Sequence, residues 1–532
     1  MLSISEKFFL SYIAGYTPPG LPGEGGLSGQ AVGSHGLWLI PLATVLGGLL
    51  AGVLVYGLAP EAEGHGTDTA VRAFHRTRGF IRARVAPLKM LASAITIGSG
   101  GAAGREGPIA LIGSGFGSFY ANLTHRTEEE RRLLVLIGMA AGLSAVFRSP
   151  IGTALFAIEV LYSDMEFDTG ALLYTMLGSV VAYVINGFFV GWEPLFRTPS
   201  DVGIHNFTDY PWYILLGIVS GIVATILPNV FYRVRDGFRA LQIPPHLKPA
   251  LGGLGIGIIA LFLPQVLGGG YGWIQQAIDG NLGIKLLIIL VLAKTLAFSF
   301  TVSSGGSGGV FAPSLFIGAM VGGVLAKVLH QPPAPFVIVG MAAVFAGAGR
   351  VPVATLLMVA EMTEGYQLLV PASLAVMLSY LIQTTLSDRL KYRSLYEGQV
   401  ASRAESPAHH VEYIQAAMQL LNERNIPLPS STSHLNLFAI LSSGIPVDLP
   451  DGKKLILGSI NPESPLVNTP VKDSFTGELE DEIEIIAIMH GGRVLLPHPD
   501  TVLEAGSQLL VVATTKAKEW LEENLAPPST MG

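Results

Sequence analysis

The sequence predicts an all-α polytopic membrane protein with a small soluble α+β domain at its C-terminal end. Three observations support this: an apolar composition, long apolar runs, and a shift in composition near residue 400. Of the 532 residues, 50% are hydrophobic and 13% are charged, and the mean hydropathy is +0.51. A soluble globular chain carries about 25% charged residues. Most of this chain is therefore expected to lie in lipid.

The apolar runs have the length that a helix needs to cross a bilayer, about 20 residues. They lie near residues 36–59, 170–191, 211–232, 248–269, 283–302, 314–329 and 367–386. Basic residues cluster instead in two loops, residues 72–84 and 126–132. Cytoplasmic loops carry an excess of Lys and Arg, so we expect both loops on the cytoplasmic side.

Composition divides the chain into four parts. Residues 1–35 form an N-terminal segment, and residues 36–400 form the membrane domain. A linker with a predicted helix at 411–425 spans residues 401–455, and a regulatory domain spans residues 456–532.

The chain contains no cysteine, which excludes disulfides and thiolate metal sites. His409, His410, His490 and His498 are scattered, and without cysteines they do not indicate a metal site. No cofactor, metal ion or nucleic-acid partner is expected.

Two pairs of segments repeat within the membrane domain. SGGAAGREGP at 99–108 matches SGGSGGVFAP at 304–313, an offset of 205 (304 minus 99). SPIGTALFAIEV at 149–160 matches VPVATLLMVAEM at 351–362, an offset of 202 (351 minus 149). Repeats of this kind often have inverted topology and place the substrate site where they meet.

The two halves, about 36–200 and 211–400, each contain a glycine run that is closed by a proline. Glycine permits irregular backbone, and proline suits the first turn of a helix. The pattern predicts broken helices whose free N–H groups face a polar gap and attract anions. Tight helix packing at the glycines is the other interpretation of either run alone. Glu106 lies within the first run, where its carboxylate would compete with an anion for the same N–H groups.

These motifs resemble the CLC family of chloride channels and chloride/proton exchangers over about residues 36–400. Residues 104–108 read GREGP, residues 309–313 read GVFAP, and EMT at 361–363 precedes YQL. The resemblance implies the CLC fold with two inverted repeats, Glu106 as the gate, and a homodimer with one pathway in each subunit. It implies an anion site formed by His65, Gly66, Arg105, Gly107, Val310, Phe311, Ala312 and Tyr396.

The chain departs from the family pattern at three places. His65 stands where the family has the serine of GSGIP, and its ring either offers an N–H to the anion or turns away. If the ring lines the pathway, transport would depend on pH, because histidine titrates near neutrality. Val160 follows Glu159 where exchangers usually carry an internal proton-transfer glutamate, and valine cannot relay protons. The run at 36–59 aligns with the family's second long helix, so the first is expected to be missing.

Two further charged residues lie in the membrane domain. Glu159 recurs as Glu361 in the other half, which favours a structural role. Lys89 either biases the local field toward anions or extends to the cytoplasmic interface.

Residues 461–515 resemble the TrkA-C module that many ion-transport proteins carry. The resemblance depends on a Ser-Pro-Leu start, the predicted strands IEIIAIM and QLLVVA, and a Gly-Gly turn between them. It implies a small ligand-sensing or dimerising domain. No GxGxxG precedes it, so dinucleotide binding is not indicated.

We therefore expect transport of chloride, or a similar small anion, through a pathway gated by Glu106. Val160 favours a channel-like mechanism with weak or absent proton coupling, and chloride/proton antiport is the alternative. A membrane-embedded enzyme is a distant alternative, because no HExxH or GxSxG accompanies the glutamates. The expected location is the inner membrane of a prokaryote, with the C-terminal domain in the cytoplasm. The expected partners are the anion, protons, lipid, a second subunit and a small-molecule ligand of the tail.

Overall fold

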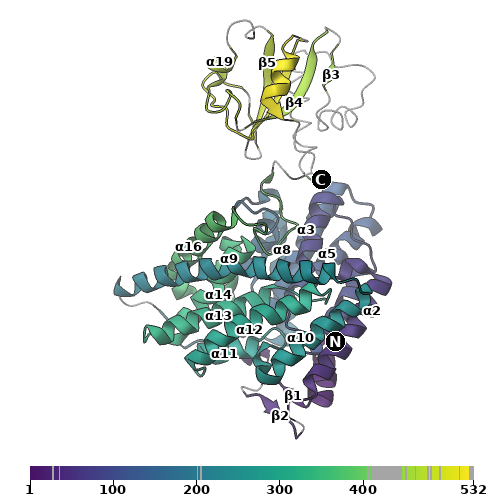
Figure 1. Ribbon diagram of the computed structural model, residues 1–532, viewed down its shortest axis with the longest axis vertical. Helices are drawn as coiled ribbons and strands as arrows, with labels where there is room; N and C mark the ends of the chain where they lie inside the picture. Colours follow the sequence, from purple (N-terminus) through teal and green to yellow (C-terminus); the bar gives the residue numbers. More distant parts are fainter. Residues whose placement is uncertain are drawn as a thin grey trace. The chain divides into compact units, whose positions relative to one another are not determined.

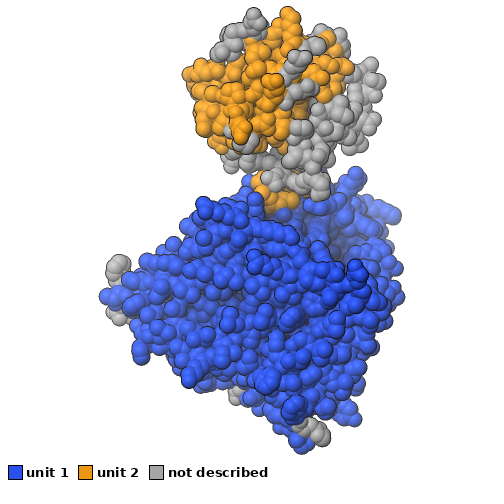
Figure 2. Space-filling view, in the orientation of Figure 1, with its two compact units in different colours: residues 1–399 blue, residues 400–532 orange. Residues whose placement is uncertain are grey.

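The computed structural model describes the chain apart from residues 25, 27–28, 35, 200–201, 204–206, 404–405, 407, 409–445, 450–451, 462, 476–478, 480–481, 491–492, 496, 515 and 527–532. The helix predicted at 411–425, together with His409 and His410, lies outside the described residues. The chain forms two compact units, Met1–Gln399 and Val400–Gly532 (Figure 2).

The first unit is a bundle of helices (Figure 1). They are α1 (Leu2–Glu6), α2 (Ile40–Leu58), α3 (Thr67–Arg76), α4 (Val85–Gly98), α5 (Glu106–Leu123), α6 (Glu128–Phe147), α7 (Pro150–Glu159), α8 (Thr169–Val190), α9 (Tyr210–Ala240), α10 (Lys248–Phe262), α11 (Tyr271–Ile278), α12 (Ile284–Ser303), α13 (Phe311–Val328), α14 (Pro333–Gly349), α15 (Pro352–Thr363) and α16 (Leu369–Ser387).

Within the described residues, seven helical segments are long and apolar enough to cross a membrane. They begin at Ile40, Thr169, Tyr210, Pro245, Ile284, Phe311 and Tyr366, and each coincides with one of the predicted apolar runs. The predicted polytopic helical fold is therefore confirmed. Before the first of these spans, a π-helical segment (Lys7–Ile13) follows α1, and β1 (Tyr16–Thr17) pairs antiparallel with β2 (Ala31–Val32).

The two repeated glycine runs contact each other directly. The amide of Gly104 donates to the carbonyl of Gly309 at 2.8 Å, and the reverse bond is 2.6 Å. Gly100 and Gly305, which are equivalent by the repeat, have φ angles of +104° and +100°. Residues with a side chain rarely adopt this backbone conformation, which explains why glycine occupies both positions. The same glycine turn therefore precedes α5 and α13.

Each half also caps a helix of the other half. The Glu159 carboxylate accepts the amides of Val353 and Ala354, at 3.0 and 2.6 Å, at the start of α15. The Glu361 carboxylate accepts the amides of Ile151 and Gly152, at 3.2 and 2.9 Å, at the start of α7. A carboxylate is stabilised at a helix N-terminus by these amides and by the helix dipole. Because each half supplies the carboxylate that caps a helix of the other half, Glu159 has a structural role.

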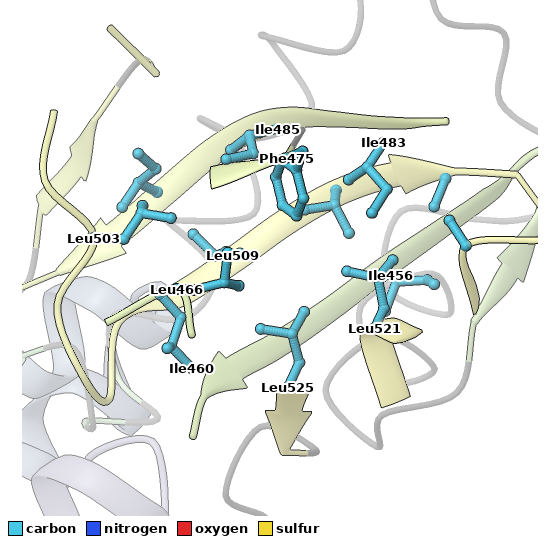
Figure 3. Packing of buried hydrophobic residues seen from close by; sticks show 14 residues of the cluster. Ile456, Ile460, Leu466, Phe475, Ile483, Ile485, Leu503, Leu509, Leu521 and Leu525 are labelled. Carbon is cyan, nitrogen blue, oxygen red and sulfur yellow. The ribbon is translucent and has the colours of Figure 1, made fainter. Parts of the chain in front are cut away.

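The second unit contains an antiparallel sheet with strand order β3-β4-β7-β5-β6, and β8 pairs with β4. Its elements are β3 (Val447–Asp448), β4 (Lys454–Ile460), α19 (Val471–Ser474), β5 (Ile483–His490), β6 (Arg493–Leu495), β7 (Gln508–Ala513), α20 (Lys518–Asn524) and β8 (Leu525–Ala526). The strands predicted from IEIIAIM and QLLVVA are β5 and β7. Alternate residues of the long strands, among them Ile483, Ile485, Leu509 and Val511, form an apolar core with Leu521 of α20 (Figure 3).

We expect the substitution Glu361→Gln to destabilise the membrane unit. The amide side chain has one acceptor oxygen, so buried N–H groups at the start of α7 would lose their charged partner. Hydrogen bonds to charged groups contribute about 1.5–3 kcal/mol each. The thermal unfolding midpoint in detergent should fall. The exposed neighbour Glu364, changed to Gln, is the matched control and should leave the midpoint unchanged. Equal midpoints for both variants would contradict the capping role.

Candidate functional site

A small cavity lies where the N-termini of α3, α5 and α13 meet. Its volume is about 10 Å³, which is close to the space that one water molecule needs. Its walls are Thr67, Glu106, Gly107, Leu143, Phe156, Val310, Phe311 and Tyr396. We call this the central cavity. Free backbone N–H groups and the positive ends of three helix dipoles surround it, which is a favourable environment for an anion.

Glycines allow the three helix ends to approach each other. A Cβ atom on Gly107 would lie 2.0 Å from the carbonyl oxygen of His65 and 2.9 Å from the Cα atom of Gly309. A Cβ atom on Gly66 would lie 2.6 Å from the carbonyl oxygen of Gly107, and Gly66 has a φ angle of +86°. Any side chain at Gly66 or Gly107 would therefore push these helix ends apart.

Glu106 is the first residue of α5, and its side chain is 1% exposed. Its Oε1 atom accepts a hydrogen bond from the hydroxyl of Tyr271. Its Oε2 atom is buried and makes no hydrogen bond to any described residue. A Cβ atom on Gly104 would lie 2.0 Å from Oε2, so the carboxyl occupies space that only glycine leaves open. The gating carboxylate predicted from sequence thus lies at the wall of the central cavity.

The rings of Phe156, Phe311 and Tyr396 line the central cavity, and two further rings outside the lining pack against Phe311. The ring centroid of Phe311 lies 4.2 Å from that of Phe345 and 4.5 Å from that of Phe147. The rings of Phe156 and Tyr396 lie 6.4 Å apart. Such an apolar wall lowers the local dielectric constant and strengthens electrostatic interactions inside the cavity.

The structure brings together five residues of the predicted site: Glu106, Gly107, Val310, Phe311 and Tyr396 all line the central cavity. Their part in anion binding stays a prediction. Thr67, Leu143 and Phe156 also line it and were not predicted. For Thr67 there was a signal in the sequence, since it follows the Gly64-His65-Gly66 turn at the first position of a helix.

The other predicted residues, His65, Gly66, Arg105 and Ala312, lie outside the lining of the central cavity. His65 and Gly66 face a second cavity of about 360 Å³, which Arg72 of the basic segment 72–84 also lines and which we call the inner cavity. The prediction of a loop over this whole segment was wrong, because residues 72–76 belong to α3. The His65 ring lies 5.5 Å from the Tyr396 ring, and its Nδ1 atom accepts the amide of Asp68 at 3.5 Å. His65 therefore stands between this inner cavity and Tyr396.

Arg105 lines another cavity instead and forms an ion pair with Glu24 of the N-terminal segment. Ala312 is the second residue of α13 and packs against the first glycine run. A Cβ atom on Gly104 would lie 2.9 Å from the Cβ atom of Ala312.

The inner cavity has charged walls of both signs. Arg235 donates two hydrogen bonds to Glu397, at 2.6 and 2.7 Å, and Arg72 donates one to Asp68 at 2.6 Å. Burial alone would raise the pKa of Glu397, but the hydrogen bonds and positive charge of Arg235 hold this pKa below its usual range.

Two buried lysines hold the loops around the site. Lys89 Nζ donates to the carbonyls of Ala62 and Gly64, at 2.9 and 2.6 Å. Lys294 Nζ, 205 positions later (294 minus 89), donates to the carbonyls of Val266 and Gly268, at 2.8 and 2.7 Å. Lys89 is fully buried, so it does not extend to the interface. The pair fixes the turns that precede α3 and α11, a role the sequence did not suggest.

Val160 is fully buried directly after the last residue of α7. His75, near the C-terminal end of α3, lies beside the same turn. Its Nε2 atom is 3.0 Å from the carbonyl oxygen of Leu161, and its ring lies 5.7 Å from that of Tyr162. A titratable side chain therefore contacts the segment that follows Val160.

Comparison with known proteins agrees with this architecture. Residues 47–384 match the family model described as voltage gated chloride channel, and residues 459–525 match the TrkA-C domain. The H(+)/Cl(-) exchange transporter ClcA of Salmonella agona (strain SL483) is 32% identical over 383 residues, which cover 68% of this chain and 80% of the relative. The ClcA protein of Salmonella gallinarum (strain 287/91 / NCTC 13346) has the same identity and coverage.

Solved structures show the same fold. A slow cyanobacterial Cl-/H+ antiporter has a TM-score of 0.61 at 25% identity, covering 68% of this chain and 86% of its own. A CLC-type fluoride/proton antiporter has a TM-score of 0.57 at 21% identity, covering 69% of this chain and 99% of its own. This chain belongs to the voltage-gated chloride channel (CLC) family and carries a C-terminal TrkA-C domain.

Proposed function

We propose that this protein exchanges chloride for protons across the membrane, and that Glu106 couples the two ions. The observation that carries the proposal is the position of Glu106 at the wall of the central cavity, between three helix N-termini. Relatives that match 68% of the chain are named H(+)/Cl(-) exchange transporters. These names favour the antiport alternative over the channel-like mechanism that the sequence favoured. They add no support to the membrane-embedded enzyme.

Electrostatic repulsion between a bound anion and the ionised Glu106 carboxyl links anion binding to proton binding at this site. The central cavity is small, so an anion within it would lie next to the Glu106 carboxyl. Two like charges 4 Å apart repel by about 4 kcal/mol at an effective dielectric constant of about 20. An anion in the cavity therefore favours the protonated, neutral carboxyl. By linkage, a proton on Glu106 favours the anion to the same extent.

Protons also need a carrier on the side of the basic loops, because Val160 cannot titrate. We propose that His75 serves there. Its ring contacts the segment after Val160 through the carbonyl of Leu161, and it lies in the last turn of α3. The negative end of a helix dipole stabilises a protonated histidine.

The proposal includes the orientation and assembly of the chain. We propose that the C-terminal unit lies in the cytoplasm of a prokaryote, because Arg389, Lys391 and Arg393 follow α16 directly. We also propose a homodimer, in which the TrkA-C domain binds a small regulatory ligand. The helix α8 leaves much of its apolar surface uncovered: Phe188 and Phe189 are 78% and 85% exposed. Lipid or a second copy covers such a face.

Proton coupling can be tested in liposomes with a chloride gradient and a clamped voltage. We expect the outward movement of chloride to drive protons uphill, which a pH electrode detects. The variant Glu106→Gln should keep chloride flux and lose proton movement, down to the level of protein-free liposomes, because glutamine carries no exchangeable proton at this site. Downhill chloride flux without any proton movement in the unmodified protein would establish the channel mechanism instead.

His75→Gln should lower the number of protons moved per chloride while chloride flux continues. The exposed residue His125, next to the other basic segment at 126–132, is the matched control, and His125→Gln should leave the ratio unchanged. A wild-type ratio in His75→Gln would exclude His75 as the inner carrier.

Dimerisation can be tested with single cysteines, since the chain has none of its own. A cysteine at Phe188 should form an intermolecular disulfide in membranes if α8 lies at the interface. A cysteine at Phe262, which is 80% exposed on α10, serves as the comparison. Disulfide formation at neither position, combined with a monomeric mass in detergent, would contradict the dimer.

A further inference from the structure

A third cavity is lined by Arg105 and Tyr271 and shares no lining residue with the inner cavity. Its volume is about 170 Å³, and the N-terminal segment forms one wall of it through Glu6 and Glu24. Arg105, the glycine loop 268–270 and Tyr271 form the other wall. We call this the outer chamber. Its lining includes Ile97, near the C-terminal end of α4, and Ser5 packs against Gly98 at that end. The basic segment 72–84 precedes the other end of α4, which begins at Val85.

The N-terminal segment is packed firmly at this place. A Cβ atom on Gly98 would lie 2.5 Å from Ser5 Oγ, and a Cβ atom on Gly272 would lie 2.0 Å from the carbonyl oxygen of Pro19. Arg148 donates to the carbonyl oxygens of Gly23 and Glu193. The family match begins only at residue 47, so this segment is a feature of the chain that the match does not cover.

Tyr271 connects the outer chamber to Glu106. The Tyr271 hydroxyl, on the chamber wall, donates its hydrogen bond to Glu106 Oε1. The Arg105 guanidinium lies 5.6 Å from the Tyr271 ring centroid and is paired with Glu24. The Glu24 carboxylate is thus already paired with the Arg105 guanidinium. Glu6 is the second carboxylate of the chamber, and no ion pair of its side chain occurs among the described residues.

Water fits between these groups. A site needs about 10–15 Å³ of accessible volume for one water molecule, and the chamber has about 170 Å³. Arg105 lines the chamber, and its Nε atom is buried without a hydrogen-bond partner in the described part of the chain. Buried donors of this kind are usually satisfied by ordered water.

The environment of Glu6 suits proton transfer. Burial and the neighbouring Glu24 carboxylate raise the pKa of Glu6 above its ordinary value, although the positive charge of Arg105 acts in the opposite direction. A carboxyl with a raised pKa takes up and releases protons closer to neutral pH than an exposed one.

We propose that Glu6 passes protons between the outer solution and Glu106, through chamber water and the Tyr271 hydroxyl. In the inward direction, the Tyr271 O–H bond breaks as its proton passes to Glu106 Oε1. The phenol oxygen takes a proton from a chamber water, and that water takes one from the Glu6 carboxyl. The outer solution then protonates Glu6 again. One proton moves, and Tyr271 and the water end unchanged. This inference rests on the proposed proton exchange.

The experiment measures proton and chloride flux of the full chain in liposomes. Glu6→Gln and Tyr271→Phe should each slow coupled proton movement about tenfold, since a positioned acid or base contributes at least this much. Glu6→Asp should restore most of the rate. Glu193→Gln is the control, because Glu193 lies next to the same segment and its side chain is 68% exposed.

A double variant, Glu6→Gln combined with Glu106→Gln, distinguishes a proton-transfer role of Glu6 from a role in holding the N-terminal segment in place. In Glu106→Gln the gate accepts no proton, so adding Glu6→Gln should leave the remaining chloride flux unchanged. Loss of that chloride flux would show that Glu6 only holds the N-terminal segment in place and would overturn the relay. Wild-type proton rates in both Glu6→Gln and Tyr271→Phe would also overturn it, while the proposed function would stand. Absence of uphill protons in the unmodified protein would refute the proposed function itself.

Discussion

The close approach of three helix N-termini is the constraint on which the site depends. The ends of α3, α5 and α13 converge because Gly66, Gly107 and Gly309 have no side chains. One helix end stabilises a charge by about 0.3–2 kcal/mol, whereas a charge at the bilayer centre costs about 2.5–3.5 kcal/mol on insertion scales. Because three helix ends converge, their summed stabilisation of a charge comes close to the cost of placing that charge in the membrane. In the proposed function, an anion enters this site and still leaves it because of this balance.

The internal repeat makes this convergence stable. Each half supplies a carboxylate that caps a helix of the other half, Glu159 for α15 and Glu361 for α7. Each half also supplies a buried lysine that holds its own turn, Lys89 before α3 and Lys294 before α11. The halves therefore cannot separate without exposing buried amides to lipid, where each unsatisfied group costs several kcal/mol.

Glu106 lies between two regions of different chemistry. On one side, His65 and Tyr396 lead toward the inner cavity with its paired arginines and carboxylates. On the other side, Tyr271 leads to the outer chamber, where the N-terminal segment contributes Glu6 and Glu24. A single carboxyl that faces the proposed anion site and a hydrogen-bonded hydroxyl has the contacts that the proposed exchange of two ions requires. The segment before the family match thus becomes part of the proposed transport pathway.

The membrane spans, the internal repeat, the glycine breaks and the position of Glu106 were all predictable from sequence, since each is a local pattern of residue type and spacing. The strands of the C-terminal domain were predictable for the same reason. Which residues line the central cavity was not predictable in this way: Thr67 and Phe156 do, whereas His65 and Arg105 do not. Arg105 turns toward Glu24, 81 positions away, and Tyr271 reaches Glu106 across 165 positions. The direction of a buried side chain depends on which distant segments pack beside it, and no local pattern records that packing.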